Sequence, residues 1–370
     1  MKTRAAILWN VKQDWSVEEV ELDPPKHGEV LVKLAASGMC HSDEHLYTGD
    51  LPAPLPCIGG HEGAGVILEL GEGVTDLEVG DHVVFAFMPA CGRCRMCSTG
   101  HQNLCDLGSK IMQGGSLYDG SYRFHAQGKD IGTMCMLGTF AEHTVVNEAS
   151  CVKIEKDIPL DKACLVGCGV TTGWGSAVYA GEIGPGDTVV VVGIGGIGMS
   201  AVQGARLAGA RHIVAVDPVE FKREQAQEFG ATHTAKDVFE AMSIVTEISW
   251  GQMADKVLVT PGVVDGNEMM PIMALVAKNG RAVITGLAPT FNFDVKLSLM
   301  DLTLMQKEIR GSLFGSANPR ADIPKLLQLY RSGQLLLDEM ITRTYPLDGV
   351  NQGYQDMRDG KNIRGVLVYD

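Results

Sequence analysis

The segment Asp187–Gly209, DTVVVVGIGGIGMSAVQGARLAG, decides the fold. It begins with a short run of β-branched residues ending in glycine, which is typical of a buried strand in a parallel sheet. From Met199 onward the pattern indicates a helix. The intervening GIGGIG fits G-x-G-x-x-G, which between a strand and a helix is typical of a loop that binds a dinucleotide.

Each glycine of this loop has a physical reason. Gly193 permits a tight turn, Gly195 lets the backbone approach a pyrophosphate, and Gly198 lets the helix pack closely. The helix N-terminus offers free N–H groups and a positive dipole to the phosphates. The candidate cofactor-binding residues here are Gly193, Ile194, Gly195, Gly196, Ile197 and Gly198. The alternative is a glycine-rich turn that binds nothing.

Asp217 strengthens the cofactor interpretation. It lies nineteen residues after Gly198, at the end of the next predicted strand, His212–Asp217. A carboxylate there accepts hydrogen bonds from the adenosine ribose hydroxyls. Its negative charge repels a 2′-phosphate, so the sequence favours NAD(H) over NADP(H).

The surrounding sequence extends the same pattern. A predicted helix follows at 221–230, and 256–260, 270–280 and 281–286 continue the alternation of strand and helix, which predicts a doubly wound parallel sheet. Roughly the first 155 residues contain short strands separated by turn residues, which indicates a barrel-like or irregular β domain. After about Gly311 the alternation ends, so the chain is expected to return to the first domain. The fold class is therefore α/β, with two domains expected from 370 residues.

Composition excludes some partners. A net charge of −14 and a pI near 5.2 argue against nucleic acid, because binding phosphates needs a basic surface. The sequence contains no apolar run of about 18 residues or more, so no membrane span is expected. No signal peptide is evident at the N-terminus. A cytoplasmic location is expected. In a reducing compartment, clustered cysteines bind metal more often than they form disulfides.

The sequence contains one local cysteine cluster, CGRCRMCSTGHQNLC. Its spacing is C-x2-C-x2-C-x7-C, and its members are Cys91, Cys94, Cys97 and Cys105. Four thiolates suit a closed tetrahedral zinc, which leaves no position for substrate and is therefore structural. An iron–sulfur cluster is the competitor, but its pattern has a shorter last gap followed by proline.

A second set of ligand types is scattered. Its members are Cys40, His61, Glu62 and Cys168, and Cys168 lies over a hundred residues from the others. Each alone is more simply interpreted as a packed core residue. Small residues around His61 and Cys168 would let the backbone crowd a site. Two thiolates, one imidazole and a water form a known catalytic zinc site.

These motifs together resemble the zinc-dependent medium-chain alcohol dehydrogenases over almost the whole chain. The resemblance rests on GMCHSDEH, GGHEGAG, the four-cysteine run, LVGCGVTTGWGSAV, GIGGIG with Asp217, and GKNIRGVLV. Further segments such as WGQMAD and GSLFGSANPR are most similar to an actinobacterial branch. That branch uses N,N-dimethyl-4-nitrosoaniline as artificial electron acceptor and is linked to the redox cofactor mycofactocin.

The resemblance implies a GroES-like catalytic domain at 1–169, a Rossmann NAD-binding domain at 170–312, and a returning catalytic segment at 313–370. It implies a catalytic zinc on Cys40, His61 and Cys168 with Glu62 nearby, and a structural zinc on the cysteine run. Ser42 and His45 match a proton relay, and Asp43 matches the residue that orients the zinc-binding histidine.

The resemblance also implies contacts with the cofactor and the substrate. The residues matched to NAD beyond the glycine loop are His41, Thr172, Asp217, Lys222, Thr285, Gly286, Leu287 and Arg364. The residues aligned with the substrate pocket are Phe87, Phe140 and Leu313, although core packing is the plainer interpretation of each.

The implied activity is oxidation of an alcohol to an aldehyde or ketone, by hydride transfer from a zinc-bound alkoxide to NAD. If the chain belongs to this branch, we expect NAD to stay bound through the cycle and to be reoxidised in place by another electron acceptor, such as mycofactocin. A homo-oligomer is expected. Two alternatives remain: a glutathione-dependent formaldehyde dehydrogenase, in which the relay position is tyrosine rather than His45, and a non-catalytic NAD-binding redox sensor.

Overall fold

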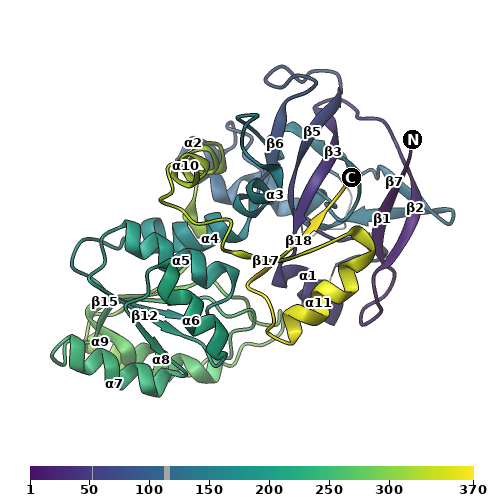
Figure 1. Ribbon diagram of the computed structural model, residues 1–370. Coiled ribbons are helices and arrows are strands. Elements are labelled where there is room, and N and C mark those ends of the chain that lie inside the picture. The colour runs from purple at the N-terminus through teal and green to yellow at the C-terminus, as the bar shows by residue number, and fades with distance from the viewer. Residues whose placement is uncertain (52, 112–116) are drawn as a thin grey trace. The chain divides into compact units, whose positions relative to one another are not determined.

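A computed structural model describes residues 1–51, 53–111 and 117–370 and divides the chain into two units (Figure 1). Unit 1 comprises Met1–Cys168 and Asn318–Asp370, and unit 2 comprises Gly169–Ala317. The second boundary falls after Ala317, later than Ser312, where the sequence placed it. The reason is close packing of Gly315, whose Cβ, if present, would lie 2.6 Å from the carbonyl oxygen of Thr172 in the same unit.

Unit 1 contains two β structures. A closed barrel has the order β1-β2-β7-β8-β4, and a larger sheet has the order β10-β6-β5-β3-β18-β17, with β9 also pairing with β3. The strands are β1 Lys2–Leu8, β2 Ser16–Leu22, β3 Glu29–Gly38, β4 Cys57–Ile58, β5 Glu62–Leu70, β6 His82–Phe85, β7 Phe124–Ala126, β8 Lys129–Thr133, β9 His143–Asn147, β10 Cys151–Ile154, β17 Ile341–Tyr345 and β18 Arg364–Val368.

Strand β3 organises the unit because three strands pair with it. Its last residue, Gly38, pairs with Glu62 of β5 and with Val366 of β18. The C-terminal strands β17 and β18 are therefore part of the larger sheet of unit 1. This pairing brings the start of β5 and the start of β18 to the segment that leads into helix α1.

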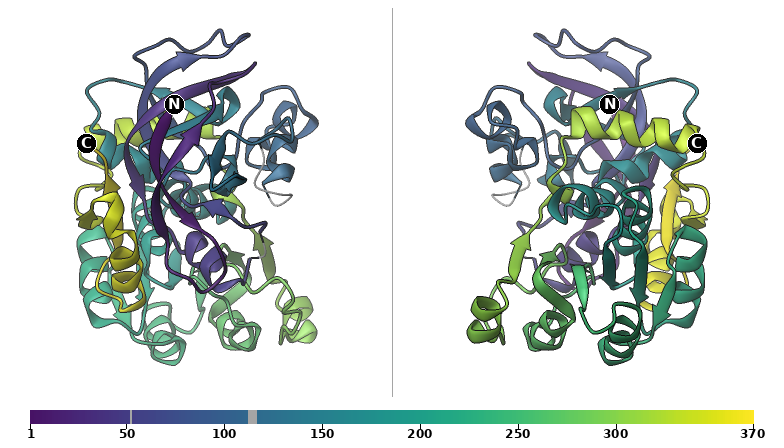
Figure 2. Two further views of the ribbon diagram at one scale, coloured as in Figure 1. Left: turned by 90° about the vertical axis from the view of Figure 1, so that its right-hand side faces the viewer. Right: turned by 90° about the vertical axis from the view of Figure 1, so that its left-hand side faces the viewer.

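The helices of unit 1 are short and connect the strands. They are α1 His41–Thr48, α2 Arg95–Ser98, α3 Leu160–Ala163, α10 Pro319–Arg331 and α11 Val350–Arg358, with single turns η1 Gln102–Leu104, η2 Asp106–Lys110, η3 Met134–Met136, η4 Glu148–Ser150, η5 Cys164–Gly167 and η9 Leu347–Gly349. Elements α2, η1 and η2 form a lobe that projects from the sheets of unit 1 (Figure 2). Helix α11 packs its buried Tyr354 against the core residues Trp15 and Phe140.

Unit 2 is built on one parallel sheet with the order β13-β12-β11-β14-β15-β16, which confirms the predicted doubly wound arrangement. The central strand, TVVVV, is fully buried, as expected where both faces of a parallel sheet are covered. Its strands are β11 Thr188–Val192, β12 His212–Val216, β13 His233–Ala235, β14 Ala254–Val259, β15 Val276–Ile284 and β16 Glu308–Gly311. The strand order reverses between β11 and β14, which makes their carboxyl ends the switch point.

The helices of unit 2 are α4 Gly169–Gly175, α5 Gly196–Leu207, α6 Glu220–Phe229, α7 Val238–Ile248, α8 Met269–Leu275 and α9 Leu299–Leu304, with shorter turns η6 Ser176–Ala180, η7 Gly266–Glu268 and η8 Phe314–Ser316. Helix α6 ends at Gly230, which has the left-handed φ of 117° that favours glycine. The alternation predicted at 270–280 is shifted, because α8 ends at Leu275 and Val276 already pairs with Ala254 in the sheet. None of the helices in the described part of the chain combines the length and apolarity that crossing a bilayer requires.

Candidate active site and cofactor loop

The scattered ligand types meet in unit 1. One ligand atom from each of Cys40, His61, Glu62 and Cys168 lies within 4.8 Å of the others, and all four residues are buried. Cys40 precedes α1, His61 precedes β5, Glu62 is the first residue of β5, and Cys168 follows η5. The pairing of Gly38 with Glu62 brings the first two segments together.

Glycines beside this site let neighbouring backbone and side chains approach closely. A Cβ on Gly60 would lie 2.4 Å from the Phe140 ring, and one on Gly167 would lie 2.3 Å from the carbonyl oxygen of Phe85. Phe87 N also donates to Gly167 O at 3.3 Å, which holds the Cys168 segment against the end of β6. Larger residues at these two glycines would push His61 and Cys168 apart.

The chemistry of these four residues fits a bound metal ion. His61 Nε2 is buried without a hydrogen-bond partner, a costly arrangement that a bound metal ion would relieve, while Nδ1 faces Asp43 Oδ2 at 3.4 Å. A hydrogen bond from Cys168 lowers the pKa of the Cys40 thiol, which favours the thiolate that binds metal. Two thiols and one imidazole are a ligand set of catalytic zinc, with one position left open.

Glu62 is the fourth residue of the ligand cluster, and it is paired with a buried arginine side chain. The guanidinium of Arg364, which is 4% exposed, forms an ion pair with the Glu62 carboxylate. Burial raises the pKa of Glu62 to about 7, although Arg364 opposes that shift. The resemblance matched Arg364 to the pyrophosphate of NAD. In the structure its guanidinium contacts Glu62, while its Nε is buried without a partner.

Helix α1 carries the predicted relay beside the ligands. Ser42 Oγ lies 3.6 Å from Cys40 Sγ. Asp43 is fully buried, accepts a hydrogen bond from Gly60 N at 2.8 Å, and has Oδ2 3.4 Å from His61 Nδ1. His45 is 4% exposed, and its ring centroid lies 5.1 Å from that of His41. Asp43 is therefore placed where it can orient His61.

The four cysteines of the lobe also converge. The sulfurs of Cys91, Cys94, Cys97 and Cys105 all lie within 4.8 Å of one another. Backbone N–H groups of Cys97 and Asp106 donate to Cys94 Sγ at 3.4 and 3.5 Å. The bond from Asp106 and then that from Cys97 lower the pKa of Cys94 to about 7. All ten cysteines of the chain are free thiols, and these four form a candidate metal site whose ligand set suits a closed tetrahedral zinc.

The glycine loop of unit 2 connects β11 to α5. Gly193, Gly195 and Gly198 differ in backbone conformation and in the space that a side chain would meet. Gly193 has φ 87°, a left-handed conformation that a tight turn requires. A Cβ on Gly198 would lie 1.9 Å from the carbonyl oxygen of Gly193. Gly195 has an extended conformation open to any residue, and its Cβ would meet nothing within 4 Å. The space at Gly195 fits a ligand that approaches the backbone, such as a pyrophosphate.

Asp217 directly follows β12, and its carboxylate holds the glycine loop in place. Its Oδ2 accepts a hydrogen bond from Ile194 N at 2.8 Å, and its Oδ1 accepts one from Val219 N at 2.9 Å. The carboxylate oxygens retain lone pairs that can accept from ribose hydroxyls. Lys222 is half-buried in α6, close to Asp217 in sequence.

Sequence reasoning missed three residues around the cofactor loop. Thr260, which follows β14, donates through Oγ1 to Gly193 O at 2.6 Å across the switch point. Ser176 Oγ lies 2.9 Å from Thr285 Oγ1 and donates to Thr172 O at 2.7 Å, which links two predicted nicotinamide contacts. Arg223 Nη1 donates to Asp217 O at 2.8 Å. Only Thr260 had a usable signal, since it ends a predicted strand at the carboxyl edge of the sheet.

The residues expected at the nicotinamide carboxamide and in the substrate pocket lie in different environments. The amides of Thr285 and Gly286 both donate to Val259 O, and Leu287 O accepts from Val264 N. These two amides and this carbonyl therefore each have a hydrogen-bond partner within unit 2. Phe87 borders the buried ligands, with its ring centroid 6.0 Å from that of His61. Phe140 is fully buried in the core of unit 1, and Leu313 is 42% exposed on unit 2.

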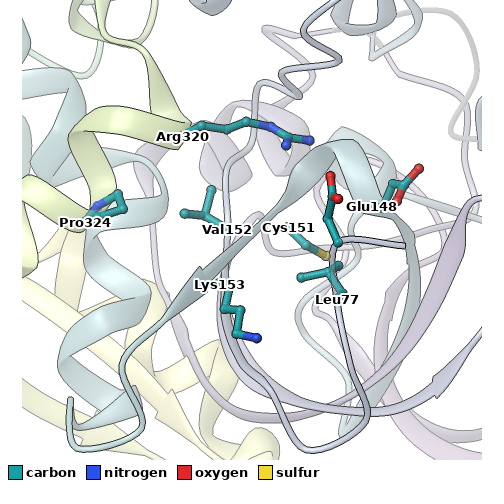
Figure 3. Close-up of a pocket in the computed structure, with 8 residues that line it drawn as sticks. Leu77, Glu148, Cys151, Val152, Lys153, Arg320 and Pro324 are labelled. Atoms are coloured by element: carbon teal, nitrogen blue, oxygen red, sulfur yellow. The ribbon is translucent and has the colours of Figure 1, made fainter. Parts of the chain in front are cut away.

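A separate pocket of about 180 Å³ lies elsewhere in unit 1. Figure 3 shows its lining, which comes from β10, from α10, from the turn before β10 and from the segment before β6. The lining residues are Asp76, Leu77, Glu148, Cys151, Val152, Lys153, Arg320 and Pro324. It shares no residue with the ligand clusters or the glycine loop, and burial raises the pKa of the Cys151 thiol, which disfavours the nucleophilic thiolate.

Comparison with known proteins places the chain in a family. Residues 26–156 match the model described as alcohol dehydrogenase GroES-like domain, and residues 196–332 match the model described as zinc-binding dehydrogenase. The chain is 54% identical over 369 residues to the NDMA-dependent alcohol dehydrogenase of Amycolatopsis methanolica, covering 100% of this chain and 99% of that protein. The chain belongs to the zinc-binding alcohol dehydrogenase family.

Other similar proteins support the same family assignment. Alcohol dehydrogenase B of Mycobacterium tuberculosis is 50% identical over 370 residues, covering 100% of this chain and 99% of that protein. Among solved structures, benzyl alcohol dehydrogenase from Acinetobacter calcoaceticus superposes with a TM-score of 0.93 at 30% identity, covering 100% of both chains. The predicted family, fold class and dehydrogenase activity are confirmed, and the chain is an oxidoreductase.

Proposed function

We propose that this chain oxidises a small alcohol with NAD at a zinc ion held by Cys40, His61 and Cys168. The convergence of their ligand atoms within 4.8 Å, with His61 Nε2 buried and lacking a hydrogen-bond partner, carries this proposal. Zinc at this site would supply a Lewis acid that makes the hydroxyl of a bound alcohol easier to deprotonate. Glu62 and Arg364 would provide a buried, paired acid beside the metal.

The chain's own residues would perform the proton chemistry. Ser42 Oγ, at 3.6 Å from Cys40 Sγ, is placed to accept the proton of the alcohol hydroxyl. His45, on the same helix, would pass that proton toward solvent, since an imidazole can accept a proton at one ring nitrogen and donate one from the other. Asp43 would hold His61 in the tautomer that binds metal. Phe87 would supply an apolar wall.

The cofactor we propose is NAD(H) rather than NADP(H). Asp217 is 5% exposed, and its carboxylate would meet a 2′-phosphate with like charge. We also propose two zinc ions for each chain, the second held by the cysteines of the lobe. The compartment we propose is the reducing cytoplasm, because ten free thiols persist most readily there.

We further propose that NAD stays bound and is reoxidised in place by another acceptor, such as mycofactocin. The 54% identity to an enzyme named for its dependence on NDMA supports this proposal. The test is to denature the purified protein and measure the NAD released. About one NAD per chain is expected. Little released NAD, together with fast turnover of added NAD, would contradict retention.

A panel of primary and secondary alcohols tests the main proposal. Each alcohol is assayed with added NAD, with added NADP and with N,N-dimethyl-4-nitrosoaniline. We expect oxidation of at least one primary alcohol, a preference for NAD over NADP, and dependence on zinc. A zinc-loaded protein that turns over no alcohol or aldehyde with any acceptor would favour the redox-sensor alternative.

The glutathione-dependent formaldehyde dehydrogenase alternative has less support. In that group the relay position is tyrosine, whereas this chain has His45. Asp50 is the only acid in the segment before His61, and its carboxylate is bound to Thr48 and His45. The segment 108–120, which contains no arginine, lies partly outside the described residues. Formaldehyde oxidation that requires glutathione would support this alternative.

The lobe yields a prediction about stability. Cys94→Ser should remove one of two zinc ions per chain and lower the melting temperature, because zinc binding contributes to the folding free energy of a closed site. Cys151→Ser is the control, since Cys151 is buried outside both ligand clusters. Metal analysis and thermal unfolding measure both effects. A folded Cys94→Ser protein with two zinc ions and wild-type stability would contradict a zinc site in the lobe.

We also propose that the chain forms a homo-oligomer, because it has an exposed apolar segment between residues 291 and 304. In unit 2 this segment precedes the edge strand β16, whose outer side is unpaired within the described sheet. A free edge beside apolar residues favours association. The segment's large exposed residues are Phe291 at 80%, Phe293 at 82%, Val295 at 56%, Leu299 at 70%, Met300 at 72% and Leu304 at 71%.

Two charges in that segment should break the assembly. Light scattering should give the native protein a mass of at least two 39.6 kDa chains. Phe293→Glu combined with Leu299→Glu should lower that mass to one chain, because burying both carboxylates at an interface is costly. Phe239→Glu, at a residue 73% exposed on α7, should leave the mass unchanged. An assembly that survives the double change would place the interface elsewhere.

A further inference from the structure

The chain reverses direction immediately after α1. Gly49 ends the helix with φ 84°, the left-handed region that favours glycine. Gly49 N and Leu51 N both donate to the carbonyl oxygen of His45, at 3.1 and 3.2 Å. These two bonds turn the backbone back along the helix, so Asp50 returns to the side of His45.

The Asp50 carboxylate reaches the relay histidine. Its Oδ2 lies 3.4 Å from His45 Nδ1 and accepts a hydrogen bond from Thr48 Oγ1 at 2.7 Å. The His45 side chain is 5% exposed, whereas that of Asp50 is 36% exposed. The carboxylate therefore lies between a buried imidazole and solvent.

The surrounding groups keep this carboxylate charged. The Thr48 hydroxyl, followed by His45 and Lys12, lowers the pKa of Asp50. Lys12 lies beside α1, because its backbone N donates to Tyr47 O at 2.8 Å. The titratable ring of His41 also lies beside His45, with the two ring centroids 5.1 Å apart. Asp50 is thus an ionised hydrogen-bond acceptor at neutral pH.

We propose that Asp50 is the positioning residue of the proton relay. Its carboxylate accepts the N–H of His45 Nδ1, which fixes the tautomer and leaves the lone pair of Nε2 to accept the proton passed on from Ser42. Once that proton arrives, the carboxylate offsets the positive charge of the ring until the proton passes to water. This inference rests on the proposed function, since it assigns a partner to the proposed relay histidine.

The test compares Asp50→Asn, Asp50→Glu and Thr48→Val in the full-length, zinc-loaded protein. Benzyl alcohol and NAD are the probes, and the readout is the single-turnover rate of reduced-nicotinamide formation. Asp50→Asn should lower that rate by about 10- to 100-fold. The alcohol concentration giving half the maximal rate should change by less than about threefold. Asp50→Glu should recover most of the rate, and Thr48→Val should lower it by about two- to fivefold.

A structural role alone would give another pattern. Added imidazole should accelerate Asp50→Asn and His45→Gln but not the wild type, because a free base can take the proton that a mispositioned or absent His45 no longer accepts. Asp130→Asn is the matched control, since His125 Nδ1 lies 2.9 Å from Asp130 in a similar pair away from the site. It should leave the rate unchanged.

Three outcomes are decisive. An Asp50→Asn rate within twofold of wild type, with His45→Gln impaired, would overturn this inference and leave the proposed function intact. Loss of zinc or of thermal stability in Asp50→Asn, without rescue by imidazole or by Asp50→Glu, would also overturn it. A wild-type protein that oxidises no alcohol from the panel would instead remove the proposed function itself.

Discussion

Cys168→Ala should lower kcat/KM for alcohol oxidation by about 10³-fold or more while the protein stays folded. Cys168 is the only predicted ligand of the catalytic metal outside the first 62 residues, and two remaining protein ligands hold zinc weakly. Without the metal, nothing in the buried cluster provides the Lewis acid, which contributes several kcal/mol to transition-state stabilisation. Metal analysis should show one zinc per chain instead of two, with the lobe still loaded.

The matched control for this prediction lies on the same segment. Cys164 is fully buried in η5, and its thiol lies 3.3 Å from Asp161 O rather than in the ligand cluster. Cys164→Ala should therefore keep two zinc ions and activity within about threefold of wild type. If Cys168→Ala retained more than a tenth of the wild-type activity, or if both variants lost activity equally, Cys168 would not be a catalytic ligand.

The parts of this molecule that were predictable from the sequence are those encoded locally. The strand–loop–helix at Asp187–Gly209 carries its own signal, because buried β-branched residues and glycines at fixed offsets suffice to define it. The cysteine lobe is local in the same sense. Both are present in the structure, and in both the residue spacing alone restricts the geometry.

The catalytic cluster could not be derived from spacing. Cys168 meets Cys40 only because β3 pairs with β5 and because η5 packs on the same sheet. That contact depends on the packing of the whole unit, so resemblance to a known family rather than periodicity identified it. The Asp50–His45 contact could not be predicted from the sequence for a different reason. It depends on the left-handed conformation of one residue, Gly49, which orients a side chain that otherwise resembles an ordinary surface acid.

Replacing the glycines of the cofactor loop should separate two effects that the sequence motif combines. Gly195→Ala should fold normally, because its backbone conformation suits alanine and its Cβ would meet no atom within 4 Å. It should nevertheless weaken NAD binding by about 100-fold or more, because the added methyl group occupies the space where a pyrophosphate approaches. Calorimetric titration of the cofactor-free protein with NAD measures this loss.

Gly198→Ala should act on folding instead. Its Cβ would lie 1.9 Å from Gly193 O and 2.9 Å from Thr260 Oγ1, so α5 must move away from the end of β11. Overpacking of this kind costs about 1–3 kcal/mol of unfolding free energy, and NAD binding falls as a consequence. Chemical denaturation of both variants without NAD should show wild-type stability for Gly195→Ala and reduced stability for Gly198→Ala. Equal stability with equal loss of NAD would mean that both glycines serve only the ligand.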